Sequence, residues 1–496
     1  MYEAKGVTDV KKKWMKIGLL AGLCLLLSGC LFRSPSDLYE QPAKSAGYEQ
    51  LNRTISDIKS GLEAEFGIGV ENAVIVTGNN TATIQLQDLD GDGERESAVT
   101  FMRLPGAENA IKIFVFRQVG DVYAVSGIVE GDGAALYSVD YVDLNGSGKK
   151  EIVVNWQVST GVYKLGAYTI DEVTKPVTIQ KEDTTVAVWQ SLNAEKRAAL
   201  RATELLLTSW SGASDGTRGY TVSDLDRDTQ AEVAVVRIDA SGVGSHVEAY
   251  DWRDGTMTSC GVVNLSSGIK SLAKLRSNYV GGELYPSALY VSSTLHDGER
   301  VVDVLTWQDG GLVNLSMDEE TGVSKEVIIG YTDVNMSDIN ADMILELPKP
   351  SPLPSLTENA PGNFYLINWY QYQKNANVRR IMTTYHNVAD GWYLEIPDNW
   401  KNKITIYKND TGVGQREVIF AYLRGGEEPP VPFLSIYRLT GTNRTAASTR
   451  AGRFVLREEE SVIYSAKFYD VKFNHGLDEV ELTDSFHVIQ TGWENY

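Results

Sequence analysis

Four short acidic segments carry oxygen-bearing side chains at one repeated spacing, which is the pattern that a hard cation requires. In each segment these side chains occupy the first, third and fifth positions, and a glutamate follows at the ninth. Ca²⁺ binds six to eight oxygens at about 2.3–2.6 Å, so alternate residues of a tight loop must turn inward. The sequence therefore predicts calcium loops. The predicted ligands are Asp88, Asp90, Asp92 and Glu96, then Asp143, Asn145, Ser147 and Glu151, then Asp224, Asp226, Asp228 and Glu232, then Asp338, Asn340 and Asp342.

The four loops are not equally suited to a cation. The first places five carboxylates in nine residues, whose mutual repulsion would oppose the turn unless a cation neutralised them. In the second, Ser147 is a poor ligand, and the third lacks the two glycines that let the backbone turn. The fourth, with Glu346 at its ninth position, is expected to be vestigial. The alternative for every loop is an acidic, solvated hairpin turn without a metal.

The residues after the loops indicate strands. An EF-hand begins in the same way but needs a glutamate at position 12 and flanking helices. Position 12 here is Val99, Val154 or Val235, each within an apolar, β-branched run. The pattern resembles the calcium-binding hairpin loops of FG-GAP/VCBS-like (integrin-α-like) propeller blades, although the Phe-Gly and Gly-Ala-Pro triplets are absent. This resemblance implies a β-propeller over residues 72–388.

The spacing of the loops favours an array of about five blades, with six still open. One four-stranded unit of about 55 residues separates the first two loops. The interval before the fourth loop has room for a blade without an acidic loop, around residues 286–293. A helix-like stretch is expected at 192–210. The predicted fold is therefore mainly β: an approximately five-bladed propeller, followed by a small α+β domain at residues 389–496.

The segments that flank the array also show clear patterns. Leu51, Ile55, Ile58, Leu62 and Phe66 have helical spacing, which predicts an amphipathic helix within a linker region, residues 30–71. This helix is expected to pack on the propeller; the alternative is a partner-binding helix. Alternate prolines at 348–354 predict a stiff loop in the last blade, or else a domain linker. In the C-terminal domain, short strands are expected to end in a helix over 477–490.

The N-terminal residues read as an export signal. Lysines precede an apolar run at 17–27, too short for a membrane span, which needs about 20 residues. The run ends in Leu-Ser-Gly-Cys30, which resembles the lipobox of bacterial lipoproteins. This implies a signal peptide at 1–29, with Met15 as a possible start, and a membrane anchor through a lipid on Cys30. An ordinary secretory signal and a retained transmembrane helix are the alternatives. The whole arrangement, including the segment 391–400, resembles a family of Gram-positive lipoproteins.

The remaining composition points to a binding protein. A net charge of −20 argues against nucleic acid as a partner. The five histidines are dispersed, and the nucleotide-binding and nucleophile motifs are absent. We therefore expect no enzyme, but a lipid-anchored, calcium-binding scaffold on the extracytoplasmic face of the cell membrane. Its expected partner is an extracellular protein or glycan, in adhesion or sensing. The alternative function is a cell-envelope hydrolase with an unrecognised active site.

Overall fold

The computed structural model describes residues 46–119, 122–170, 192–212, 218–239, 241, 243–328, 334–354, 364–424 and 428–489. The predicted signal peptide and Cys30 lie outside the described residues. Within those residues, each helix is too short or too polar to cross a bilayer. The protein is mainly β, with antiparallel sheets that follow one another along the chain.

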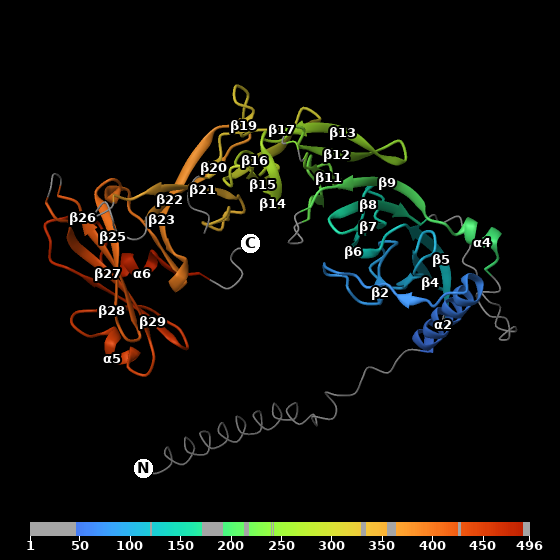
Figure 1. Cartoon of the computed structure of the whole chain (residues 1–496), viewed down its shortest axis with the longest axis horizontal. Coiled ribbons are helices and arrows are strands. Elements are labelled where there is room, and N and C mark those ends of the chain that lie inside the picture. Colours follow the sequence, from blue (N-terminus) through green and yellow to red (C-terminus); the bar gives the residue numbers. More distant parts are fainter. Residues whose placement is uncertain are drawn as a thin grey trace, which may run out of the picture.

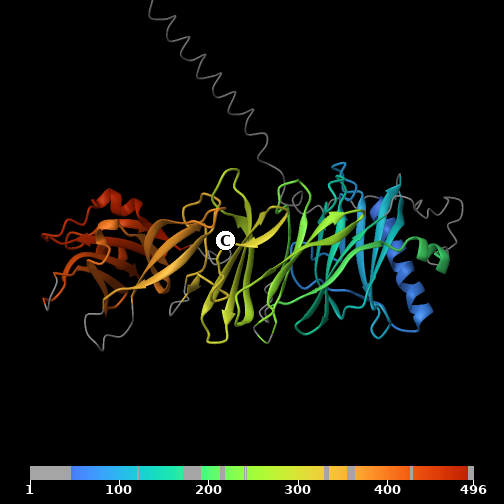
Figure 2. The ribbon, with the colours of Figure 1, turned by 90° about the horizontal axis from the view of Figure 1, so that it is seen from above.

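Six sheets form an open arc (Figure 1; Figure 2 shows it from above). The first sheet contains β1 (Glu71–Asn72), β2 (Ile84–Gln87), β3 (Ser97–Arg103), β4 (Ile111–Val119) and β5 (Val122–Gly131). The second contains β6 (Ala135–Val142), β7 (Glu151–Ser159), β8 (Val162–Thr169) and β9 (Thr203–Trp210). The third contains β10 (Tyr220–Ser223), β11 (Glu232–Arg237), β12 (His246–Arg253) and β13 (Thr256–Asn264).

The other three sheets complete the arc. The fourth contains β14 (Ile269–Tyr279), β15 (Ser287–Leu295), β16 (Arg300–Gln308), β17 (Gly311–Asn314) and β20 (Val327–Ile328), beside a hairpin of β18 (Met317–Asp318) and β19 (Val323–Ser324). The fifth contains β21 (Glu346–Pro352), β22 (Tyr365–Tyr372), β23 (Val378–Asn387), β24 (Trp392–Glu395) and β30 (Phe486–Val488). The sixth contains β25 (Ile404–Gly412), β26 (Gln415–Tyr422), β27 (Val431–Thr440), β28 (Phe454–Glu458) and β29 (Val462–Phe468).

Helical elements are short apart from the first. They are α2 (Ala46–Phe66), α4 (Ala194–Ala199), α5 (Arg444–Ser448) and α6 (Glu479–Asp484), with 3₁₀ turns at Val388–Asp390 and Asp398–Trp400. The predicted N-terminal helix is confirmed by α2, whose Leu51, Ile58 and Leu62 are buried in a shared cluster with Phe114 of the first sheet. Burial against that sheet supplies the stability that a lone helix of this length lacks in water.

The inner strands are buried on both faces because the sheets stack against one another. In β11, Val233 and Val235 pack in a cluster with side chains of the second sheet. The alternate residues, Ala234 and Val236, pack in a cluster with side chains of the fourth sheet. A strand that is covered on both sides must be apolar at every position, which explains the continuous apolar runs after the acidic loops.

The structure contains the predicted repeat of successive small antiparallel sheets, but these sheets do not form the closed propeller that was predicted. Five successive sheets of four or five strands occupy the described part of residues 71–395, and the one without an acidic loop contains β15, as expected. However, Figure 1 shows the first and fifth sheets far apart along the arc, so these sheets do not form a ring, and none of the described sheets closes on itself. Each neighbouring pair instead buries its own core.

Two predicted helices are largely replaced by strands. Within 192–210, only α4 is helical, and Leu206 and Trp210 lie in β9, which pairs with β8. The alternating exposure of β9 shows that strand pairing overrides the weak helical pattern. At the C-terminus, α6 begins with a capping box formed by Asp478 and Glu481. It ends early because the residues from Phe486 pair with β24.

Two further predictions change at the fifth sheet. The proline-rich segment is not a loop but β21, which pairs with β22 along its length. Alternate prolines all lack an N–H on the same side of a strand, so an edge position tolerates them. The domain boundary predicted at residue 388 falls between β23 and β24, which pair with each other. The last strands of the fifth sheet therefore come from the segment assigned to the C-terminal domain.

Candidate metal centres

The acidic loops occupy corresponding places in their sheets, and neighbouring loops are in contact. The first three connect β2 to β3, β6 to β7 and β10 to β11, and the fourth precedes β21. The Lys150 amide in the second loop donates to the Leu89 carbonyl in the first, over 2.9 Å. A Cβ on Gly146 of the second loop would lie 3.1 Å from the Gln230 side chain of the third. The structure therefore brings the first three loops together in a row.

All four loops share one backbone conformation, including those that lack glycine. The fourth and sixth positions have positive φ in each loop, and the residues are Gly91, Gly93, Gly146, Gly148, Arg227, Thr229, Ala341 and Met343. In every loop the sixth amide donates to Oδ2 of the first aspartate, over 2.7–3.1 Å. A non-glycine residue held in this conformation costs about 1–2 kcal/mol. The third and fourth loops thus keep the cation-loop geometry at a cost in free energy.

The first loop gathers four carboxylates without enough hydrogen-bond donors. Ligand oxygens of Asp88, Asp90, Asp92 and Glu96 all lie within 4.8 Å of one another. Asp90 Oδ1 and Glu96 Oε2 are buried and have no hydrogen-bond partner. Burial raises the pKa of Glu96, and the neighbouring Asp90 and Asp92 raise it further. This set of ligand oxygens comes mostly from carboxylates and has few hydrogen-bond donors around it, which fits Ca²⁺.

The third loop contains a second such group, in a more buried setting. Oxygens of Asp224, Asp226 and Glu232 lie within 4.8 Å of one another. Glu232 is fully buried; its Oε2 accepts the Leu225 amide over 2.5 Å, whereas its Oε1 has no hydrogen-bond partner. Burial raises the pKa of Glu232 to about 7. An unpaired carboxylate oxygen in this position is costly without a proton or a cation.

Two residues of the third loop and its surroundings differ from the prediction. Asp228, a predicted ligand, is not part of this group of three and accepts the Gln230 backbone amide over 2.8 Å and its side-chain amide over 2.9 Å. Asp251 on β12 lies near enough to raise the pKa values of Asp226 and Glu232. Sequence reasoning missed Asp251 because it lies outside the loop motif. In the pairing of β11 with β12, Val233 lies opposite Tyr250. Asp251 follows Tyr250 in the chain, so strand pairing brings it close to Glu232, which precedes Val233.

The second loop satisfies its own oxygens. Asn145 Nδ2 donates to Glu151 Oε1 over 2.9 Å, and the Leu144 amide donates to Glu151 Oε2 over 2.8 Å. Ser147 Oγ accepts the Lys149 amide over 3.3 Å. Asp143 accepts the Gly148 amide. With the amide in this orientation, the predicted ligands Asn145 and Glu151 bind each other, and the loop fits a cation less well than the first and third do.

In the fourth loop a side-chain amide stands between the predicted ligands. Gln371 Nε2, from β22, donates to Asp342 Oδ2 over 2.7 Å and to Glu346 Oε1 over 2.5 Å. Asn340 Nδ2 also donates to Asp342 Oδ2, over 2.9 Å. Gln371 faces Glu346 in the β21–β22 register, so only strand pairing reveals it. These hydrogen bonds satisfy the Asp342 and Glu346 oxygens without a cation; that the loop is vestigial stays a prediction.

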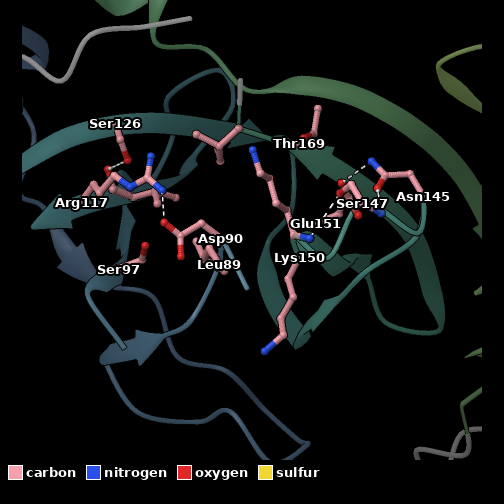
Figure 3. A pocket seen from close by; sticks show the side chains of 13 residues that line it. Leu89, Asp90, Ser97, Arg117, Ser126, Asn145, Ser147, Lys150, Glu151 and Thr169 are labelled. Carbon is pink, nitrogen blue, oxygen red and sulfur yellow. Dashed lines mark hydrogen bonds and ion pairs between the residues drawn. The ribbon is translucent and has the colours of Figure 1, made fainter. Parts of the chain in front are cut away.

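A cavity of about 150 Å³ lies between the first and second loops (Figure 3). Arg117, from β4, forms an ion pair with Asp90 on one side of it, and the Asn145–Glu151 hydrogen bond lies on the other. Lys150 also lines this space. The Arg117 guanidinium pairs with Asp90 Oδ2 and compensates part of the charge of the first loop, whereas Asp90 Oδ1 has no hydrogen-bond partner.

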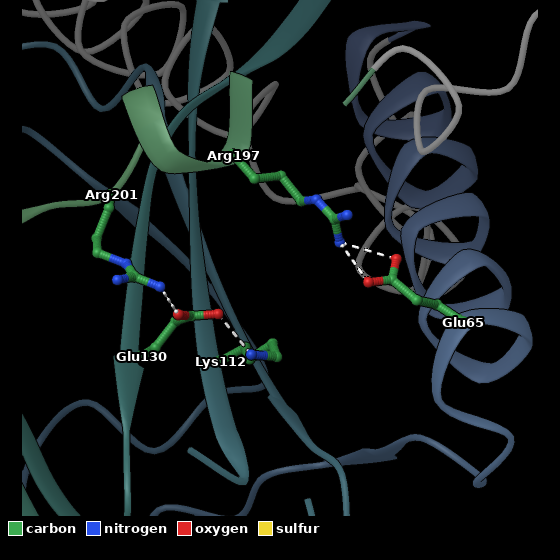
Figure 4. A network of polar contacts seen from close by, with 5 residues as sticks. All are labelled: Glu65, Lys112, Glu130, Arg197 and Arg201. Atoms are coloured by element: carbon green, nitrogen blue, oxygen red, sulfur yellow. Dashed lines mark hydrogen bonds and ion pairs between the residues drawn. The ribbon is translucent and has the colours of Figure 1, made fainter. Parts of the chain in front are cut away.

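A second hollow, at the N-terminal end of the arc, is held by paired charges (Figure 4). Glu130 accepts from Lys112 and, over 2.6 Å, from Arg201. These contacts hold the pKa of Glu130 below its usual value despite its burial. Arg197 of α4 pairs with Glu65 of α2 over 2.8 Å. Each charge shown has a partner, so this network ties α2 and α4 to the first sheet.

Comparison with known proteins gives no family. No family model matches the chain, and no curated protein matches it. Among solved structures, the chain is similar to the exotype rhamnogalacturonan lyase YesX, with 12% identity over 71% of each chain and a TM-score of 0.25. It is also similar to AofleA from Arthrobotrys oligospora, with 10% identity over 75% of this chain and 90% of that chain, and a TM-score of 0.21. TM-scores this low carry no argument about function.

Proposed function

We propose that this protein is a calcium-stiffened binding scaffold on the extracytoplasmic face of the cell membrane, anchored by a lipid on Cys30. Its sheets serve as FG-GAP-type blades arranged in an open row, and cations bind at the first and third acidic loops. The scaffold would present the outer surface of the row to an extracellular protein or glycan. The anchor and the location rest on the N-terminal sequence motif.

One observation carries the calcium proposal. Glu232 is fully buried beside Asp224 and Asp226, and its Oε1 has no hydrogen-bond partner. A folded protein seldom leaves a buried carboxylate oxygen unpaired, because the oxygen loses its hydrogen bonds to water and no protein hydrogen bond replaces them. The Leu225 and Asp226 amides donate to Oε2, which leaves Oε1 as the unpaired oxygen of this carboxylate. A cation at this point would satisfy all three.

The role of the ion is expected to be structural. The carboxylates of the first and third loops come from single hairpins, so a bound ion would stiffen the turn between two strands of one sheet. The loops also touch one another, so stiffening one supports its neighbour. Neither role needs an open coordination position, which a catalytic metal requires. This favours a scaffold over the alternative of an envelope hydrolase.

The proposal is tested by calcium titration of the detergent-purified protein, first stripped with a chelator. Calorimetry should detect binding at two sites, with dissociation constants of about 10⁻⁴–10⁻³ M, as in extracellular modules. The melting temperature should rise with calcium and return when the chelator is restored. Mg²⁺ at the same concentration is the control, since it prefers a smaller octahedral site. Absence of both calcium heat and thermal stabilisation would contradict the proposal.

A further inference from the structure

A larger cavity, of about 580 Å³, lies between the third and fourth acidic loops. Small-molecule sites in proteins commonly have volumes of about 300–1,000 Å³. Residues of both loops line it, together with residues of β14 and the first residue of β15. It is therefore assembled from three successive sheets of the arc.

The lining of this cavity is polar and offers hydrogen-bond donors and acceptors in turn. Ser223 and Ser277 bring hydroxyls, whose oxygens lie 3.2 Å apart, and Asn278 brings an amide. Asp224 and Asp338 bring carboxylates from the two loops. A ligand that fits must carry groups that both donate and accept, and hydroxyl groups have this property. Two carboxylates against the single guanidinium of Arg227 give the lining a net negative charge, which disfavours an anionic ligand.

An aromatic and apolar rim adjoins the polar lining. The rings of Tyr279, which lines the cavity, and Tyr285 are 6.3 Å apart. Arg227, also in the lining, donates to the Tyr285 carbonyl over 3.0 Å and so holds this part of the β14–β15 connection in place. Leu284 precedes Tyr285 in that connection and its side chain is exposed, and Met343 lines the cavity from the fourth loop.

Leu284 and Tyr285 are held in a backbone conformation that their side chains disfavour. Leu284 and Tyr285 have φ values of 64° and 49°, in the left-handed region where glycine and asparagine are favoured. Their exposed fractions are 80% and 46%, so burial within this chain contributes little to offset the strain. Bulky apolar side chains kept at strained, exposed positions indicate a role outside the fold itself.

We propose that this cavity binds a neutral oligosaccharide. Sugar hydroxyls would bond to the serine, asparagine and aspartate side chains, and Tyr285 would pack on an apolar sugar face, with Leu284 and Met343 extending that contact. A sugar ring has hydroxyl groups around its edge and an apolar face. The polar lining of the cavity would suit the hydroxyl groups, and the adjoining aromatic and apolar side chains would suit the apolar face. The inference rests on the proposed function, since calcium in the third loop would fix Asp224 and Arg227 in one wall.

The test uses the double substitution L284G/Y285N in the detergent-purified chain with calcium. Calorimetry measures the binding of two neutral probes, cellotetraose and fully N-acetylated chitotetraose. We expect the wild type to bind at least one of them, and the double variant to bind it at least about tenfold more weakly. Because glycine and asparagine suit left-handed backbone, the melting temperature of the variant should equal or exceed that of the wild type.

The control is A451G, which relieves left-handed strain at φ 57° in the connection before β28. It should leave saccharide binding unchanged. Failure of the wild type to bind either probe, or undiminished binding by the double variant, would overturn this inference. Preference for an acidic probe, tetragalacturonate, over both neutral ones would overturn it as well. Calcium-dependent melting, measured on the same samples, reports on the proposed function separately, so the two can fail independently.

Discussion

Gln371 donates its side-chain amide to the carboxylate of Glu346, with 2.5 Å between Nε2 and Oε1. The two residues face each other across β21 and β22. In the third loop, the corresponding oxygen of Glu232 has no hydrogen-bond partner. One amide thus distinguishes a loop whose ninth-position carboxylate is fully hydrogen-bonded from a loop whose carboxylate keeps an unpaired oxygen, although both share one backbone conformation.

Replacing Gln371 by glutamate should convert the fourth loop into a calcium site. The substitution removes the donor and brings a further carboxylate to Asp338, Asp342 and Glu346. In chelator, repulsion among these acids should lower the free energy of unfolding. In calcium at a hundredfold excess over the dissociation constant, the added site should contribute about 2.7 kcal/mol. Urea unfolding in both conditions measures the change. Q308E on β16 makes the same charge change and should create no added calcium dependence; equal responses of the two variants would refute this account.

Glu232→Gln should abolish calcium binding at the third loop while the fold is retained. The amide keeps the shape of the side chain but removes the charge that attracts the ion. The variant should therefore lose the calcium-dependent stability of one site, about 2.7 kcal/mol at a hundredfold excess. In chelator it should be at least as stable as the wild type. Calorimetry that still finds two sites in this variant would show that Glu232 is not a ligand.

The buried carboxyl of Glu232 should also make stability depend on pH in the absence of calcium. Its pKa is raised by burial from 4.5 to about 7, so the folded state binds the proton more tightly than the unfolded state. Stability from this group is complete below pH 4.5 and is lost as the pH rises to about 7. Calcium competes with the same proton, so its affinity should rise over this range.

The measurement is the free energy of unfolding at pH 5 and pH 8 in chelator. The wild type should lose more stability between these two values than Glu232→Gln, which has no proton to release. Other titrating groups, including Glu346 with its pKa of about 7, affect both proteins alike and cancel in the comparison. Identical losses in the two proteins would rule out the assignment to Glu232.

The contact between the first and second loops should respond differently to alanine at two neighbouring glycines. A Cβ on Gly91 would lie 1.9 Å from the Gly148 carbonyl oxygen, whereas a Cβ on Gly93 would meet nothing within 4 Å. Both glycines have positive φ, so Gly93→Ala should cost only the left-handed strain, about 1–2 kcal/mol. Gly91→Ala should cost more and weaken calcium binding at the first loop. Denaturant unfolding should rank the two variants in this order, and the reverse order would mean that the loops are not in contact.

Loss of Cys30 should release the protein from the membrane. In the wild type, lipidation should carry the protein into the detergent phase after extraction. Cys30→Ala should remain unprocessed or appear in the aqueous phase, because the thiol that accepts the lipid is gone. Cys260→Ala serves as the control, since this half-buried thiol has a pKa raised by burial to about 11 and is unreactive. If Cys30→Ala is cleaved to the size of the wild type and still partitions into detergent, the anchor assignment is wrong.

Local patterns in the sequence were sufficient for the elements whose stability is decided nearby. The spacing of Leu51, Ile58 and Leu62 predicted α2, because a helix with one apolar face needs only some apolar surface to cover it. The apolar runs after the acidic loops predicted inner strands, since only strands covered on both faces are apolar throughout. The loop motif predicted tight loops between strands, and each first aspartate bonds to amides of its own loop, but that the loops without glycine keep the same backbone conformation was not predicted.

Tertiary structure alone decided what depends on residues far apart in the chain. Leu206 and Trp210 could belong to a helix until pairing with β8 made them part of β9. The open arc, rather than a ring, depends on how successive sheets pack, and no local pattern encodes that angle. The state of each acidic loop depends on its neighbours: Gln371 is 29 residues from Asp342, and Arg117 is 27 residues from Asp90. A sequence motif specifies which oxygens a loop can offer. Whether each oxygen has a hydrogen-bond partner is decided only when the strands pair and bring distant residues to the loop.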